Sequence, residues 1–291
     1  MQKIIPFLWF DDNAMDAMEF YTSIFENAKI TQIIMAGSDG AIFGGAFEIA
    51  GQQFNTLNGG PMFKLTPAIS FYVHCQSEPE IDQLWRRFSP GGSALMDLAE
   101  YPFSKKFGWI QDKFGLTWQF NLSIDTPVAQ KITPLLMFVG KQAGKTEEAI
   151  NYYVSLFENS EIKLIARYEA GEGDIEGNIK HASFLLDEQG FMAMGSSHNH
   201  DFSFNEAFSL FVSCETQPEI DEFWENLSMD GEKSRCGWLK DKYGVSWQIV
   251  PTILGQLLGD KDPQKAQRVM QAMMKMDKIN IAELKKAYDQ A

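Results

Sequence analysis

The sequence contains little cysteine. Its three cysteines, Cys75, Cys214 and Cys236, form no Cys-x-x-Cys pair, and an odd number fits poorly with a framework of disulfide bonds. A reducing cytoplasm is therefore the expected compartment. Long hydrophobic runs are also missing, because no uncharged apolar stretch reaches the roughly 20 residues of a membrane-spanning helix. The first residues, MQKIIPFLWFDD, do not have the pattern of a signal peptide or a targeting helix.

Basic residues are scarce. The 25 lysines and arginines face 39 acidic residues, which gives a formal net charge of -14. Neutralising phosphates needs clustered basic side chains, so neither a nucleic acid nor an anionic membrane surface is an expected partner. The hydrophobic content of 45% is typical of a globular protein. A length of 291 residues suggests about two domains.

Several sequence motifs of enzymes are absent. The sequence has no Ser-His-Asp triad spacing, no phosphate-binding glycine loop and no dinucleotide fingerprint. It also has no strand, glycine-rich loop and helix in succession that could bind a nucleotide-like methyl donor. Hydrolase, nucleotide-dependent and methyltransferase activities are therefore disfavoured.

An internal repeat is the strongest feature that is present. FGWIQDKFGLTWQ at 107–119 matches CGWLKDKYGVSWQ at 236–248 at seven of thirteen positions. QKIIPFLWF at 2–10 is likewise similar to QKITPLLMF at 130–138, and SEPEIDQLW at 77–85 to TQPEIDEFW at 216–224. The repeat predicts two domains, at 1–125 (copy one) and 130–257 (copy two). The polar segment 123–129 is the expected linker, and residues 259–291 are the expected helical tail.

Each copy shows the same element order twice. In copy one, an apolar run at 3–10 predicts a strand, and an apolar stripe from Ala17 to Phe25 predicts an amphipathic helix. Three strand candidates follow near 28–36, 43–50 and 52–57. A strand at 68–75, a helix capped by Ser77 with Glu80, and strands near 94–100, 107–112 and 116–122 repeat the order. The chain therefore has four β-α-β-β-β modules. In the tail, Asp262-Pro263 and Asn280 with Glu283 predict two helix starts.

Paired modules of this kind resemble the vicinal oxygen chelate (glyoxalase-like) superfamily. The segments GWIQDKFGLTWQ and GWLKDKYGVSWQ and the tail QRVMQAMMKMDKINIAELKKAY are similar to its PhnB-like branch, also labelled 3-demethylubiquinone-9 3-methyltransferase. The resemblance implies an α+β fold in which each pair of modules curls an eight-stranded sheet around a cavity. Because single-copy relatives pair as dimers, it also implies that the two halves form a pseudo-dimer within the chain.

The resemblance further implies positions for metal ligands, since catalytic relatives hold a divalent metal with His, Gln and Glu. These positions fall at Ile5 and Thr133, at Ala68 and Ala207, at Gln119 and Gln248, and near 55–58 and 192–195. Alkyl side chains cannot coordinate a metal, and a lone amide binds one weakly. We therefore expect no metal ligands and no cofactor. A bound divalent metal is the disfavoured alternative.

Strand parity predicts which side chains face the cavity. In 116–122, Trp118 and Phe120 share the apolar face, whereas Thr117 and Gln119 share the polar face that should meet the cavity. A glutamine satisfied by neighbouring backbone is the alternative. Trp109 and Trp238 are expected in the core, with stacking on a ligand as the alternative. The complete set of expected cavity residues is Trp9, Asn55, Tyr72, Thr117, Gln119, His181, Phe211, Ser246 and Gln248.

Histidines at two positions of copy two could take part in acid–base or metal chemistry. His181 opens a strand of copy two and is the weak candidate for a catalytic acid or base, because its pKa lies near neutrality; a structural role is the alternative. Its counterpart in copy one is Gly45. The segment His198–Asp201 has metal-ligand chemistry, but a solvated loop is the preferred interpretation.

The favoured function is binding of an unknown small organic molecule in the sheet cavity without a metal. One alternative is a metal-dependent glyoxalase- or dioxygenase-like enzyme with a relocated site, which would use His181, Gln248 or His198. Another is a structural role with one degenerate copy, so that a single cavity binds. A methyltransferase, as the label of the branch suggests, is disfavoured.

Overall fold

The computed structural model describes residues 2–36, 40–124 and 128–290. Part of the predicted linker, residues 125–127, therefore lies outside the described residues. The chain divides into two compact units. The larger unit is Pro6–Phe208, and the smaller unit combines Met1–Ile5 with Ser209–Ala291.

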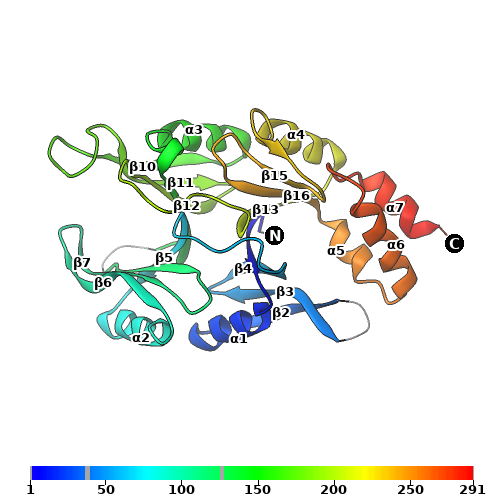
Figure 1. Ribbon diagram of the computed structural model, residues 1–291, viewed down its shortest axis with the longest axis horizontal. Helices are drawn as coiled ribbons and strands as arrows, with labels where there is room; N and C mark the ends of the chain where they lie inside the picture. Colours follow the sequence, from blue (N-terminus) through cyan, green and yellow to red (C-terminus); the bar gives the residue numbers. More distant parts are fainter. Residues whose placement is uncertain (1, 37–39, 125–127, 291) are drawn as a thin grey trace. The chain divides into compact units, whose positions relative to one another are not determined.

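The larger unit contains three β-α-β-β-β modules. The first module consists of β1 (Ile4–Phe10), α1 (Ala14–Ile24), β2 (Lys29–Ala36), β3 (Ala41–Ile49) and β4 (Gln52–Asn58). The second consists of β5 (Ile69–Cys75), α2 (Glu78–Phe88), β6 (Ser93–Tyr101), β7 (Ser104–Gln111) and β8 (Thr117–Leu122). The third consists of β9 (Ile132–Phe138), the short helix η1 (Gly140–Gln142), α3 (Thr146–Leu156), β10 (Glu161–Arg167), β11 (Ile179–Leu186) and β12 (Gln189–Gly195) (Figure 1).

One eight-stranded sheet lies wholly in the larger unit. Its strand order is β10-β11-β12-β9-β5-β8-β7-β6. At its centre β5 pairs with β9 in antiparallel fashion, with Tyr72 opposite Thr133. The sheet therefore joins the second module of copy one to the first module of copy two.

This pairing refines the expectation from the resemblance. Two eight-stranded mixed sheets are present, as expected, but the sheet of the larger unit is not made by two modules of the same copy. The physical reason is that β5 and β9 are both first strands of a module, and their free edges can form a backbone ladder across copies. The repeat defines the modules, but it does not determine which edges pair, because both copies offer the same edges.

The smaller unit contains the fourth module and the tail. Its elements are β13 (Phe208–Cys214), α4 (Gln217–Leu227), β14 (Glu232–Lys233), β15 (Trp238–Lys240), β16 (Ser246–Pro251), α5 (Ile253–Leu258), α6 (Pro263–Met273) and α7 (Ile281–Asp289). The strand order within it is β14-β15-β16-β13. The amide of Ser213 donates to the carbonyl of Lys3, which ties β13 to the start of the chain. The strands of the second eight-stranded sheet are thus divided between the units.

The helix starts confirm the predicted caps. Ser77 accepts a hydrogen bond from the amide of Glu80 in α2, and Thr216 accepts one from the amide of Glu219 in α4. In the tail, Asp262 caps α6 and Asn280 caps α7 through their side chains. Such caps satisfy backbone amides that a helix leaves free at its first turn.

The repeated segment owes its pattern to a buried aspartate. Asp112 accepts hydrogen bonds from the amides of Phe114 and Leu116, from the indole of Trp118 at 2.9 Å and from the hydroxyl of Tyr21 at 2.8 Å. Asp241 in copy two accepts the corresponding bonds from Tyr243, Val245 and Trp247. A buried carboxylate needs such partners. The residues that the two copies share therefore stabilise the hairpin turns that precede β8 and β16.

Candidate ligand-binding site

The sheet of the larger unit has two chemically different faces. Trp118 and Phe120 of β8 pack against Phe88 of helix α2, with ring centroids 5.0 and 5.2 Å apart. This is the apolar face that strand parity predicted, and it is covered by a helix. Gln119 lies on the opposite face, which is called the inner face from here on.

A row of four side chains crosses the inner face at the join between the copies. Trp109 on β7 lies opposite Gln119 on β8, which lies opposite Tyr72 on β5, which in turn lies opposite Thr133 on β9. Three of these residues come from copy one, and Thr133 comes from copy two. The row is therefore assembled only when the two halves share the sheet.

The inner face is curled. The rings of Tyr72 and His181 lie 6.4 Å apart between centroids, although β5 and β11 are separated by β9 and β12. In a flat sheet, strands three positions apart would be about 14 Å apart. The curl brings Tyr72 and His181, both expected cavity residues, next to each other.

Most of the inner face is apolar. Leu135, Met137, Val139 and Met192 form a buried cluster against which Tyr72, Trp109, Met194 and Phe202 pack while remaining partly exposed. Methionines adapt their shape to a neighbour because their side chains are flexible and polarisable. The cluster offers a deformable apolar surface with aromatic edges.

The polar groups of the inner face are few. Gln119 donates from Nε2 to the hydroxyl of Ser70 at 3.0 Å, and Thr117 donates to the carbonyl of Ile69. By contrast, the buried indole nitrogen of Trp109 has no hydrogen-bond partner among the described residues. Buried donors in folded proteins are almost always paired. The Trp109 N–H is therefore a donor that a bound molecule could satisfy.

Burial determines the protonation of the groups around Tyr72. Desolvation lowers the pKa of His181. Desolvation also lowers the pKa of His74, with further contributions from Lys131 and His181. Desolvation raises the pKa of Tyr72, with the nearby Cys75 adding to the shift. At neutral pH both imidazoles and the phenol are uncharged, so this part of the inner face suits an uncharged group.

Comparison with known proteins agrees with the repeated architecture. The family model described as 3-demethylubiquinone-9 3-methyltransferase matches residues 2–121 and, a second time, residues 130–250. The chain belongs to this family. The two matches in tandem confirm the PhnB-like assignment and the duplication. The word methyltransferase is part of the description of the family, and it assigns no reaction to this chain.

Several solved structures are similar to this chain. A protein from Bacillus cereus, titled a putative 3-demethylubiquinone-9 3-methyltransferase, PhnB protein, is 40% identical; the match covers 42% of this chain and 100% of that chain, with a TM-score of 0.41. A glyoxalase I variant from Zea mays is 10% identical over 85% of this chain and 94% of that chain, with a TM-score of 0.56. A putative dioxygenase from Bacillus subtilis is 7% identical over 84% and 83% of the two chains, with a TM-score of 0.50. The last two show the glyoxalase-like fold. A search of curated proteins found no match.

The residues of this family member do not fit the divalent metal of glyoxalase-like relatives. Gln119 donates from Nε2 to Ser70, which leaves a single amide oxygen, Oε1, as its possible ligand atom, and Ala68 and Met192 offer no oxygen or nitrogen donor from their side chains. Among residues 2–36, 40–124 and 128–290, no group of three or more His, Cys, Asp or Glu side chains could hold a metal ion.

The other expected cavity residues of the larger unit lie in its first module. Trp9 on β1 donates from its indole nitrogen to the carbonyl of Gly60 at 2.8 Å and meets the ring of Phe63 edge to face. Asn55 on β4 accepts a hydrogen bond from Gln53. Both residues are half-buried and are engaged within their own module.

The expected residues of copy two that follow Phe208 lie in the smaller unit. Gln248 on β16 donates to Ser209 at 2.9 Å, which repeats the bond between Gln119 and Ser70. Ser246 is buried, and its hydroxyl has no hydrogen-bond partner among the described residues. Phe211 packs against a cluster formed mainly by the tail. Trp238, Gln248 and Phe211 lie opposite one another as Trp109, Gln119 and Tyr72 do in the larger unit, and Phe211 is partly buried against the tail.

His198 and His200 each contact a neighbouring polar group. His198 is exposed and contacts the carbonyl of Gly173 at 2.7 Å, while His200 contacts the hydroxyl of Ser196 at 2.9 Å. Gln248 belongs to the smaller unit. The positions of His198 and His200 agree with the preferred interpretation of a loop.

Sequence reasoning missed several residues of the inner face. Trp109 was expected in the core, but it is half-buried and lies beside Gln119. His74, Met137 and Met192 were not singled out. The alternation within 68–75 could have identified His74, because it shares parity with Tyr72. The two methionines belong to copy two, and their place beside Tyr72 and Trp109 on the inner face depends on the exchange of modules.

Among the described residues, no helix is long and apolar enough to cross a membrane.

Proposed function

We propose that this PhnB-like protein binds a small organic molecule on the inner face of its larger unit without a metal. The observation that carries the proposal is the buried Trp109 N–H, which has no partner among the described residues and lies beside a methionine-rich surface. Sites for small molecules are typically apolar, with a few placed polar groups. The ligand would place a hydrogen-bond acceptor at Trp109 and an apolar body on Met137 and Met192.

The neutral state of His181 and His74 favours an uncharged ligand. No carboxylate belongs to the row Trp109–Gln119–Tyr72–Thr133. The same histidines leave acid–base chemistry available to the protein, but the contacts described above support binding and no particular reaction.

The proposal also includes the way in which the two copies pair within the chain. The second and third modules share one sheet across the copies, and this exchange would take the place of dimerisation between separate subunits. The linker at 123–129 and the domain boundaries at 1–125, 130–257 and 259–291 remain predictions.

A thermal-shift screen of uncharged metabolites, followed by calorimetric titration of the hits, tests the proposed function. A ligand stabilises the folded state by mass action, so a true hit raises the melting temperature in proportion to its occupancy. Trp109→Phe should lower the affinity for a hit by about five- to tenfold, which corresponds to the loss of one hydrogen bond of about 1 kcal/mol. Trp238→Phe, at the corresponding position of copy two, is the matched control. The proposal fails if both variants bind hits as tightly as the unaltered chain.

Metal analysis of the purified protein tests the alternative of a metal-dependent enzyme. A stoichiometric divalent ion that survives dialysis and is lost in Gln119→Leu would favour this alternative over the proposed function.

A further inference from the structure

The edge of the fourth module is much shorter than the corresponding edge of the second module. In copy one, β6 and β7 are nine and eight residues long. In copy two, β14 and β15 are two and three residues long. The missing part of the hairpin would have formed the side wall of the sheet beside β16.

The tail occupies the position of that missing strand. In copy one, Phe107 of β7 is paired with Ala99 of β6. Its counterpart Cys236 donates its amide to the carbonyl of Met276 at 2.8 Å, and the next residue, Gly237, donates to Asp277 at 2.8 Å. The backbone of the tail thus takes over a pairing that belongs to an edge strand in the other copy.

The tail also covers the face of β13 and β16 that carries Gln248. Phe211 and Val250 lie on this face, because Phe211 is opposite Gln248, and Val250 is two residues further along β16. Both pack into one apolar cluster with the tail, whose buried members besides Val250 are Leu254, Leu257, Val269, Met276, Ile279 and Leu284. The counterparts of Phe211 and Gln248 in copy one are Tyr72 and Gln119, which lie on the inner face of the larger unit.

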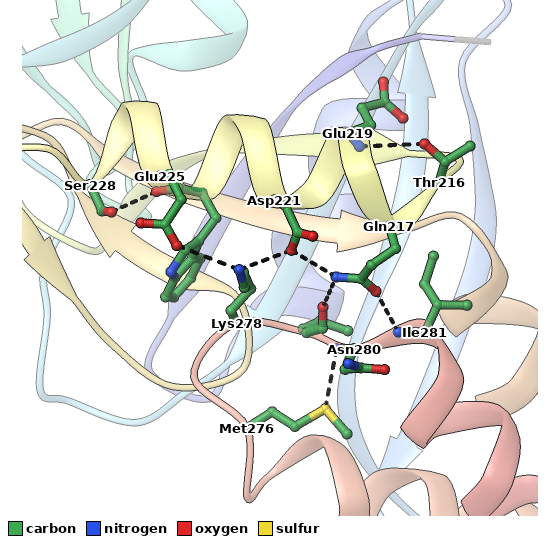
Figure 2. A network of polar contacts seen from close by, with 12 residues as sticks. Thr216, Gln217, Glu219, Asp221, Glu225, Ser228, Met276, Lys278, Asn280 and Ile281 are labelled. Atoms are coloured by element: carbon green, nitrogen blue, oxygen red, sulfur yellow. Dashed lines mark hydrogen bonds and ion pairs between the residues drawn. The ribbon is translucent and has the colours of Figure 1, made fainter.

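A polar latch fixes the tail to α4 (Figure 2). Gln217 donates to the carbonyl of Ile279 at 3.1 Å and accepts from the amide of Ile281 at 2.8 Å. Lys278 lies 2.9 Å from Asp221 and 3.4 Å from Glu225. The side chains of Gln217 and Lys278 are partly exposed, so both can be replaced without altering the apolar side chains of the cluster beneath them.

We infer that the C-terminal helical tail packs on, and thereby occupies, a second small-molecule-binding surface of this chain. This surface is the face of β13 and β16 that carries Gln248. This inference rests on the proposed function for the kind of ligand, and it adds that the tail packs against the second of the two surfaces. Opening the latch exposes an apolar surface beside Phe211 and Gln248, which then takes a second molecule.

Cys236 provides a direct readout of tail opening. Its thiol lies beneath the tail, half-buried, and donates to the carbonyl of Met273. The other two cysteines, Cys75 and Cys214, are fully buried on β5 and β13. Reaction with Ellman's reagent under native conditions therefore reports chiefly on Cys236, and Cys236→Ser identifies its share of the signal.

The test compares a double variant, which carries both Gln217→Ala and Lys278→Ala, with the single variant Lys275→Ala. The single variant removes the same charge from the same loop. Lys275 makes no ion pair with any described residue, so its loss should leave the tail closed. The double variant should react at Cys236 about five- to tenfold faster, because two hydrogen bonds and two partly exposed ion pairs are lost. It should also bind one additional equivalent of 8-anilinonaphthalene-1-sulfonate in equilibrium dialysis.

An unchanged rate at Cys236 overturns the inference, as does a faster rate without the additional equivalent of dye. Failure of the proposed function looks different. In that case no metabolite depends on Trp109, whereas the extra equivalent of dye in the latch variant still appears.

Discussion

The Nε2 atom of Gln119 lies 3.0 Å from the hydroxyl oxygen of Ser70 and donates a hydrogen bond to it. Gln119 stands where glyoxalase-like relatives are expected to keep a metal ligand. Because the same bond joins Gln248 to Ser209 at 2.9 Å, both copies have used this amide for pairing within the sheet. In each copy the bond connects neighbouring strands, β8 to β5 and β16 to β13.

This bond gives a first prediction. Ser70→Ala should lower the free energy of unfolding by about 1–2 kcal/mol, because the buried amide of Gln119 loses its acceptor. Ser209→Ala should have a similar effect through Gln248. Denaturant unfolding of both variants measures the change. Replacing Ser70 and Gln119 together by Ala and Leu should cost less than the sum of the single changes, and strictly additive losses would contradict the pairing.

The pKa of His181 gives a pH prediction. Because desolvation lowers its pKa in the folded state, the unfolded chain binds a proton at a higher pH than the folded chain does. The free energy of unfolding should therefore fall as the pH drops from about 7 through the folded-state pKa, by up to about 1.4 kcal/mol per pH unit for one proton. His181→Gln should flatten this slope, and the exposed His198→Gln serves as its control. Equal slopes in the two variants would rule out His181 as the source.

Gly59 gives a prediction about the first module. A Cβ atom at this position would collide with the indole ring of Trp9, so Gly59→Ala should destabilise the protein by about 1–3 kcal/mol and change the fluorescence of Trp9. Gly255→Ala is the counterpart, because nothing lies near its Cβ and it sits within helix α5. There alanine should stabilise by about 0.5–1 kcal/mol. Melting temperatures that shift in the same direction in both variants would be inconsistent with this packing.

The shared sheet predicts the behaviour of a cut chain. If a protease site is placed in the segment 123–129 and cleaved under native conditions, the two fragments should stay together, because β5 and β9 pair across the cut. Size-exclusion chromatography should show one species of unchanged volume, and denaturing electrophoresis should show two fragments. Elution of separate fragments would mean that each copy closes its own sheet.

The sequence predicted the local features of this fold because they depend on nearby residues. The cap at Ser77, the helix start at Asn280 and the two faces of β8 each follow from spacing within a few residues. The pairing of β5 with β9 did not follow, since it depends on which of several equivalent strand edges meet. For the same reason, the sequence placed Tyr72 in the cavity but could not identify its neighbours from copy two.

The candidate site was predictable in composition but not in detail. Parity placed Gln119 and Thr117 on the polar face, and the structure places them there. Whether an indole N–H finds an acceptor depends on atoms that are distant in sequence, so Trp109 was assigned to the core. The tail was predicted as helical, but its contact with Phe211 depends on the shortening of β14 and β15, which no local pattern reveals.

A duplicated gene usually leaves one half free to diverge or disappear. Here the ladder between β5 and β9 limits that freedom, because a half on its own would expose a central strand as a sheet edge unless it paired with a second copy. Substitutions along this seam have to be tolerated by both halves at once. We therefore expect sequence variation to be concentrated in the loops and the outer strands. We also expect the two halves to be inherited together.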